Sequence, residues 1–83
     1  MEDGLAVPFY QKVIEMAVSD TAENKSLLIQ AYGYLGAYHA NVKKDFHLAL
    51  SNFDKILELD PWNDDAVRYR EILHKWVNAE TRN

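Results

Sequence analysis

The chain has 83 residues, enough for one small domain over residues 1–83, with 48% hydrophobic and 27% charged residues. Its net charge of -4 argues against binding to nucleic acid or an anionic membrane surface, and the absence of cysteine excludes disulfides. No apolar run approaches the roughly 20 residues that cross a bilayer, and the acidic Glu2 and Asp3 stand where a signal peptide would be basic. We therefore expect a soluble protein without membrane insertion, in a compartment that the sequence leaves open.

The first helix is predicted over about residues 5–18. Apolar side chains recur there every three or four positions, as one face of an α-helix requires. Pro8 lies within or beside the first turn, where a missing N–H costs least. The apolar positions are Leu5, Ala6, Phe9, Val13, Met16 and Ala17.

The second helix is predicted over about residues 25–40, with Asn24 as its N-cap. Gly33 and Gly36 inside it each cost about 0.5–1 kcal/mol relative to alanine, which predicts a close helix–helix contact at one of them. Asn41 is expected to end the helix in the left-handed conformation. The predicted packing stripe consists of Leu28, Ala31, Tyr32, Leu35, Tyr38 and His39.

The third helix is predicted over about residues 46–59. Asp45 is its expected N-cap, and Pro61 prevents its continuation. Its apolar positions are Leu48, Ala49, Phe53, Ile56, Leu57 and Leu59, and Leu57 is expected in the core.

The fourth helix is predicted over about residues 64–79, after Asn63 as N-cap. Trp62 and Val67 have the spacing of a hydrophobic staple across that cap. The residues expected to face inward are Ala66, Tyr69, Ile72, Leu73, Trp76 and Val77.

The chain repeats itself. Residues 10–16 (YQKVIEM) match residues 53–59 (FDKILEL), and in the same register Ala6 aligns with Ala49. A repeated helical unit is typical of a solenoid, in which each unit buries its apolar face only by stacking on the next.

Residues 29–63 carry a pattern that resembles the tetratricopeptide repeat family. In that family a first helix has a bulky residue, Leu-Gly and an aromatic, and a second helix has a small residue, an aromatic and a closing proline. The matching positions are Tyr32, Leu35, Gly36, Tyr38, Ala49, Phe53 and Pro61. The resemblance implies an all-α fold of four antiparallel helices, stacked as helix-turn-helix repeats in a right-handed α-solenoid. One full repeat would follow the second helix of a preceding repeat and come before a C-terminal capping helix. Because the sequence begins with the second helix of a repeat, we expect it to be the C-terminal part of a longer repeat protein.

The resemblance also implies a function. The family is a scaffold that binds other proteins and does no chemistry, so we expect a protein or peptide partner, no enzyme activity and no cofactor. The second and fourth helices would line the concave side, with Ala37 and Ile72 among the residues on that surface. The expected partner-binding residues there are Gln30, Tyr34, Asn41, Arg68, Tyr69 and Lys75. A competing interpretation packs Tyr34 against Tyr69 as part of the fold.

Two other functions stay open on the sequence. One is a structural role, either as a cap of a larger array or as a homodimer formed through Phe9, Val13 and Met16 of the first helix. A metal protein is the third hypothesis, because Glu71 and His74 have the Glu-x-x-His spacing of di-metal bundles. Such a site needs both side chains to face inward beside a further carboxylate, and an exposed pair without metal is the favoured interpretation.

Overall fold

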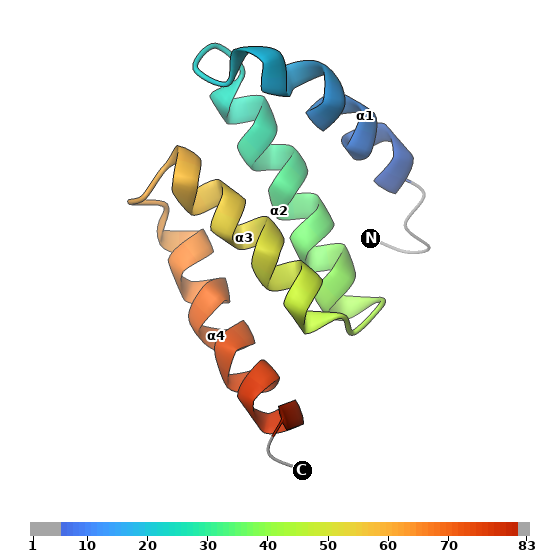
Figure 1. Cartoon of the computed structure of the whole chain (residues 1–83), viewed down its shortest axis with the longest axis vertical. Coiled ribbons are helices and arrows are strands. Elements are labelled where there is room, and N and C mark those ends of the chain that lie inside the picture. The colour runs from blue at the N-terminus through green and yellow to red at the C-terminus, as the bar shows by residue number, and fades with distance from the viewer. Residues whose placement is uncertain (1–5, 82–83) are drawn as a thin grey trace.

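The computed structural model describes residues 6–81, and this part of the chain is all-α, as predicted (Figure 1). Its helices are α1 (Val7–Ala17), α2 (Lys25–Asn41), α3 (Phe46–Leu59) and α4 (Asp64–Thr81), with a short 3-10 helix, η1 (Val18–Asp20), after α1. The predicted helix boundaries agree with these to within about two residues, apart from the predicted start of the first helix at Leu5, which lies outside the described residues.

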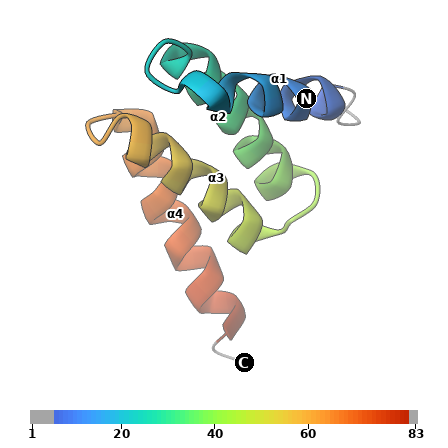
Figure 2. The ribbon, with the colours of Figure 1, turned by 45° about the horizontal axis from the view of Figure 1, so that its top comes forward.

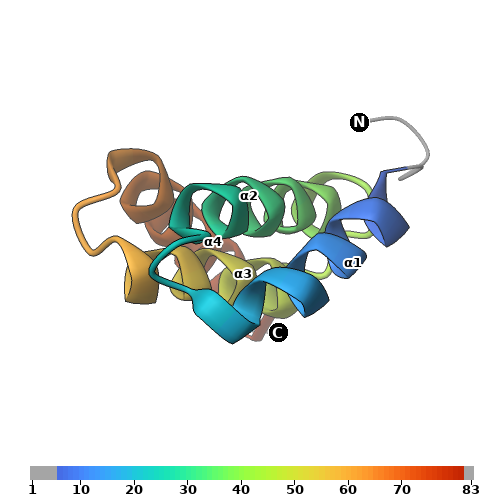
Figure 3. The same cartoon turned by 90° about the horizontal axis from the view of Figure 1, so that it is seen from above.

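Each helix packs mainly on the next one in the chain. Successive helices α2, α3 and α4 alternate in direction (Figure 1), whereas α1 runs back across α2 at an oblique angle (Figure 2). Seen from above, α1 lies diagonally across one side of the molecule, away from α4 (Figure 3). The molecule measures 42 × 30 × 17 Å, so it is a flattened body in which α2 and α3 are the central helices.

The central helix α2 is buried on two faces. Leu28 and Leu35 are buried on one face, and Gly36 and Ala40 on another. Because neighbours cover it on both sides, its apolar residues do not form the single stripe that the sequence analysis assigned to it. The predicted stripe also included His39, which is only half-buried.

The close contact predicted for a glycine lies at Gly36. A Cβ built on Gly36 would stand 2.7 Å from Cε2 of Phe53, a distance that real Cβ atoms do not tolerate. Ala49 is the small residue of the repeat pattern on α3. Ala49 is fully buried, but it is the ring of Phe53 that occupies this space.

The apolar face of α4 is wider than the surface that covers it. Ala66 and Leu73 are buried in the core, as predicted. Tyr69, Ile72 and Trp76, which were also expected to face inward, are 49%, 40% and 44% exposed. The expectation was wrong for these three because α3 covers only the part of the helix surface around Ala66 and Leu73.

The turn before α4 also differs from the prediction. Trp62 is 88% exposed, so it forms no hydrophobic staple with Val67. Asn63 is the predicted N-cap, and its side-chain oxygen accepts the N–H of Ala66 at 2.9 Å. The cap therefore directs the chain into α4 without help from the tryptophan.

Of the caps predicted for α2 and α3, one is confirmed and one is wrong. Asp45 caps α3 as predicted, because its carboxylate accepts the N–H of Leu48 at 3.1 Å. Asn24 does not cap α2, since its side-chain amide donates instead to the carbonyl of Ala17 at the end of α1, at 3.3 Å. The left-handed residue after α2 is Lys44, with φ 55°, while Asn41 stays helical.

The observed Asp45 cap leads to a modest stability prediction. Substitution Asp45→Ala leaves one N–H of the first turn of α3 without its side-chain acceptor, so we expect a loss of about 1 kcal/mol in the free energy of unfolding. Chemical denaturation measures it. Asn24→Ala is the control, because Asn24 was predicted to cap α2 but donates to Ala17 instead. We expect this variant to lose only the stability that comes from the hydrogen bond to Ala17. A shorter helix α2 in Asn24→Ala would show that Asn24 does cap that helix.

The internal repeat of the sequence recurs in the contacts. Tyr10 of α1 stacks on Tyr34 of α2, with ring centroids 4.6 Å apart. Phe53, which aligns with Tyr10, stacks on Tyr69 of α4 at 5.0 Å. In both halves an aromatic residue of one helix therefore stacks on an aromatic residue of the helix that follows. The ion pairs Lys12–Glu15 and Lys55–Glu58 also occupy matching positions, each at 4.0 Å.

Candidate protein-interaction groove

A groove runs between α2 and α4, with α3 beneath it. Two hollows lie along it, of about 280 Å³ and about 140 Å³. Ala37, Phe53 and Tyr69 line both hollows, so they join the two into one surface, which we call the α2/α4 groove. The larger hollow is further lined by Ile29, Gln30, Gly33, Tyr34, Ile56, Asn63, Asp65 and Ala66, and the smaller by Ala40, Asn41, Ile72, Leu73 and Trp76.

Local structure explains why the groove is open. Gly33 and Ala37 lie on the side of α2 toward the groove, and neither has a side chain long enough to fill it. Phe53 of α3 forms the floor, where it is buried to 4% exposure between Gly36 and the ring of Tyr69. Small residues on one wall and a flat ring beneath them leave a shallow channel between the two helices.

Most of the predicted binding residues lie on this groove. Gln30 and Tyr34 line the larger hollow, and Asn41 lines the smaller one. Tyr69 lines both and, with Arg68, also borders an adjoining hollow of about 230 Å³ on the outer side of α4. Lys75 is exposed and lines none of these three hollows.

Tyr34 and Tyr69 stand on opposite walls and each stacks on a different ring. Tyr34 stacks on Tyr10 of α1, and the side-chain amide of Gln30 donates to the hydroxyl of Tyr10 at 3.5 Å. Tyr69 stacks on Phe53. The ring contacts of the two tyrosines therefore anchor each one to its own wall, and the competing interpretation, in which they pack on each other, is not what the ring stacking supports.

The smaller hollow is the more apolar part of the groove. Ile72 and Trp76 form its outer wall, and the indole of Trp76 lies 5.1 Å from the ring of Phe46 at the start of α3. Asn41 is the one amide side chain among its lining residues, which are otherwise aliphatic or aromatic. This end of the groove can therefore take a bulky apolar side chain, and the amide of Asn41 stands at its edge.

Electrostatically the groove is close to neutral. Among the residues lining the three hollows, Asp65 and Arg68 are the charged ones, and they pair with each other at 4.0 Å across one turn of α4. Both side chains are more than two-thirds exposed, so this pair is hydrated and contributes little to stability. A neutral groove with aromatic walls and amide edges favours apolar ligands over strongly charged ones.

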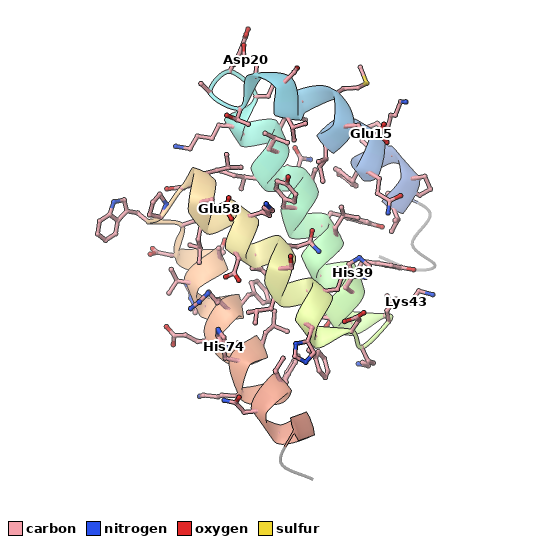
Figure 4. All side chains as sticks on the ribbon, viewed as in Figure 1. Glu15, Asp20, His39, Lys43, Glu58 and His74 are labelled. Atoms are coloured by element: carbon pink, nitrogen blue, oxygen red, sulfur yellow. The ribbon has the colours of Figure 1, made fainter. Side chains whose placement is uncertain are left out.

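The metal hypothesis depends on how Glu71 and His74 are placed. Glu71 is exposed on α4 and His74 is half-buried one turn later, so the pair does not face inward as the metal hypothesis requires. Over residues 6–81 no three histidine or carboxylate side chains come together in a way that could hold a metal ion. Figure 4 shows the labelled ionisable residues spread over all four helices, η1 and the turn between α2 and α3. In the same part of the chain, no helix combines the length and apolar character that a bilayer crossing requires.

Sequence reasoning missed part of the apolar half of the site. It placed Ile72 both in the core and on the concave surface, but it placed Trp76 in the core alone and did not assign Phe53 a role as the floor of a groove. The sequence of the fourth helix held a signal for this part of the site. Six of its positions were predicted to face inward, which is more apolar surface than one neighbouring helix can cover.

Comparison of the chain with protein-family models, with curated proteins and with solved structures gave no match. The resemblance to the tetratricopeptide repeat therefore rests on the residues of this chain alone.

Proposed function

We propose that this chain is a protein–protein interaction module that binds an amphipathic helix of a partner protein in the α2/α4 groove. One observation carries the proposal. Tyr69, Ile72 and Trp76 form an apolar stripe along one wall of the groove, and each leaves 40% or more of its surface in water. Aromatic side chains beside a shallow apolar hollow are the groups that typically anchor protein interfaces.

Two features of the packing support a repeat architecture of the tetratricopeptide kind. The helices pack in chain order, with α2, α3 and α4 alternating in direction. The stack of Tyr10 on Tyr34 recurs as the stack of Phe53 on Tyr69, so the same helix-to-helix contact is used in both halves. In such a fold the α2/α4 groove is the concave side.

The chemistry of the groove indicates which kind of partner segment it binds. Its hollows accept apolar side chains, and its two charged residues, Asp65 and Arg68, already pair with each other. A helix with apolar residues at spacings of three and four places several side chains in one groove. We expect modest affinity, with a dissociation constant on the order of 10–100 µM, because one groove of this size anchors few side chains.

The test compares two apolar residues on the same helix. Ile72 and Val67 are both β-branched and are 40% and 38% exposed, but only Ile72 lines the groove. Amphipathic helical peptides are selected from a displayed library against the unmodified chain, and their affinities are then measured for Ile72→Glu and Val67→Glu. We expect at least a tenfold loss of affinity for Ile72→Glu, since a carboxylate in the hollow loses its hydration, and less than a twofold change for Val67→Glu.

Two results would contradict the proposal. One is a selection that yields no helical peptide with measurable affinity for the folded chain. The other is a set of peptides whose affinity falls equally in the two variants, because binding would then not depend on the groove. Circular dichroism of both variants is the control, and we expect the same helix content as in the unmodified chain because both positions are exposed.

A further inference from the structure

The smaller hollow of the α2/α4 groove combines buried apolar side chains with partly exposed aromatic ones. Phe53 and Leu73, which line it, are only 4% and 1% exposed. Tyr69 and Trp76 also line it and are 49% and 44% exposed. Among the described residues no charged side chain lines this hollow, whereas Asp65 lines the larger one. The smaller hollow is therefore the part of the groove where an uncharged apolar group gains most by leaving water.

The size of this hollow suits one six-membered ring. Its volume is about 140 Å³, and an apolar cavity of about 150 Å³ is large enough to hold a benzene molecule. Ala37 and Ala40 on the α2 side have only methyl side chains, so they leave this volume unfilled. A single ring that enters between α2 and α4 therefore occupies most of the hollow.

The rings around the hollow favour an aromatic occupant over an aliphatic one. Tyr69 stacks on Phe53 with ring centroids 5.0 Å apart, and Trp76 lies 5.1 Å from Phe46. Tyr69 and Trp76 keep exposed surface beside the hollow, so an incoming ring meets two aromatic partners. Contacts between aromatic rings are more favourable than the area that they bury, by roughly two- to tenfold in affinity.

We infer that the smaller hollow is a subsite for one phenylalanine side chain of the bound partner helix. The occupant belongs to the same partner helix as before, so this assignment rests on the proposed function. A leucine would enter the hollow without gaining the ring contacts, and phenylalanine is therefore the side chain that the subsite selects. Gln30, Asn63 and Asp65 line the larger hollow, which takes the more polar part of the same helix.

Two blocked amino acids test the subsite without the rest of a helix. N-acetylphenylalaninamide carries the expected side chain, N-acetylleucinamide is its aliphatic counterpart, and neither is charged. Each is titrated to about 20 mM into the unmodified chain, and methyl NMR signals follow the binding. We expect a dissociation constant on the order of 10 mM for the phenylalanine compound, because a ligand of so few atoms binds weakly. The value for the leucine compound should be roughly two- to tenfold higher.

The methyl groups that respond show where the ring binds. Of the two hollows in the groove, Ala40 and Leu73 line only the smaller, and Ile29 and Ile56 line only the larger. A bound ring shifts the signals of nearby methyl groups through its ring current. We therefore expect the phenylalanine compound to shift the signals of Ala40 and Leu73 and to leave those of Ile29 and Ile56 in place.

Two tryptophan variants form a matched pair for the ring contacts. Trp76→Leu keeps the wall of the hollow apolar but removes one aromatic partner, and we expect roughly threefold weaker binding of the phenylalanine compound. Trp62→Leu makes the same change at a residue that lines neither hollow of the groove, so its affinity should equal that of the unmodified chain. Circular dichroism checks that both variants keep their helix content.

Four results would overturn the subsite. They are the absence of binding at about 20 mM, equal affinity for the two compounds, equal affinity of Trp76→Leu and the unmodified chain, and shifts at Ile29 and Ile56 instead of Ala40 and Leu73. Shifts of Ala40 and Leu73 on concentrating the chain without ligand would assign the hollow to a second copy, which also contradicts the proposal.

Failure of the subsite and failure of the proposed function give different results. The helical peptides are selected without any requirement for phenylalanine, so peptides that depend on Ile72 keep the proposed function even if the phenylalanine compound does not bind. In the reverse case, the phenylalanine compound binds beside Ala40 and Leu73 but no helical peptide is selected. That result overturns the partner helix and keeps the hollow as a site for an aromatic ring.

Discussion

Substitution Ile56→Asp is expected to unfold the protein at room temperature. Ile56 is 3% exposed in the middle of α3, within the cluster that includes Phe53, Ala66 and Leu73. A carboxylate there would lose its hydration without gaining a partner, at a cost of several kcal/mol. A domain of this size has a free energy of unfolding of only about 5 kcal/mol, so this one change removes most of its stability.

The neighbouring residue gives the matched control. The sequence analysis placed Leu57 in the core, but the structure leaves it half-buried at the edge of that cluster. Leu57→Asp should therefore cost about 1–3 kcal/mol and leave a folded protein with a lower melting temperature, because the carboxylate can reach water. Thermal unfolding followed by circular dichroism measures both variants. Equal losses at the two positions would show that α3 is rotated relative to its described position.

Alanine substitutions at the two glycines of α2 are expected to have opposite signs. At Gly36 the new methyl group would lie 2.7 Å from the buried ring of Phe53, which is itself held by its stack on Tyr69. We expect Gly36→Ala to destabilise the fold by about 1–3 kcal/mol, and the larger, branched side chain of Gly36→Val to unfold it. At Gly33 the nearest atom is Cδ1 of Ile56, at an ordinary contact distance of 3.8 Å.

Gly33→Ala should therefore stabilise the protein. The gain is about 0.5–1 kcal/mol, since alanine loses less backbone entropy than glycine in a helix and meets no obstruction here. Urea denaturation of the two variants gives the sign directly. If Gly36→Ala were as stable as Gly33→Ala, the contact between α2 and α3 would be looser than described, and Phe53 would not be the floor of the groove.

The sequence predicted the helices well because each of them has strong local signals. Apolar spacing placed all four, and the aspartate and asparagine caps at Asp45 and Asn63 fixed where α3 and α4 begin. These signals depend on residues within one turn of each other, so they do not require knowledge of the tertiary structure.

Tertiary packing explains the errors. Asn24 is a residue type that commonly caps helices, but the carbonyl of Ala17 at the end of α1 lies close enough to accept a hydrogen bond from its side-chain amide. Trp62 has the spacing of a staple, yet its turn directs it into solvent. In both cases the local pattern allowed two outcomes, and the position of another helix or of the turn decided between them.

The candidate site was predicted from the family resemblance more than from its chemistry. The resemblance placed Gln30, Tyr34 and Tyr69 on a shared surface, and the structure places them on the walls of one groove. It placed Ile72 on that surface as well, but it did not identify Trp76, because an apolar residue that lines a groove has the same helical spacing as one in the core. The part of the apolar face of α4 that stays exposed to solvent depends on how much of it α3 covers. A local sequence pattern does not contain that information.

The most direct test of the central claim uses the two tryptophans of the chain. Trp76 lines the smaller hollow of the α2/α4 groove, and Trp62 stands in the turn between α3 and α4. Trp62→Phe leaves Trp76 as the single fluorescent indole, and Trp76→Phe leaves Trp62. On titration with a selected amphipathic peptide that lacks tryptophan, we predict a blue shift in the emission of Trp76 and no change in that of Trp62. A peptide that binds without shifting the emission of Trp76, or that shifts Trp62 instead, would contradict the assignment of the α2/α4 groove as the binding site.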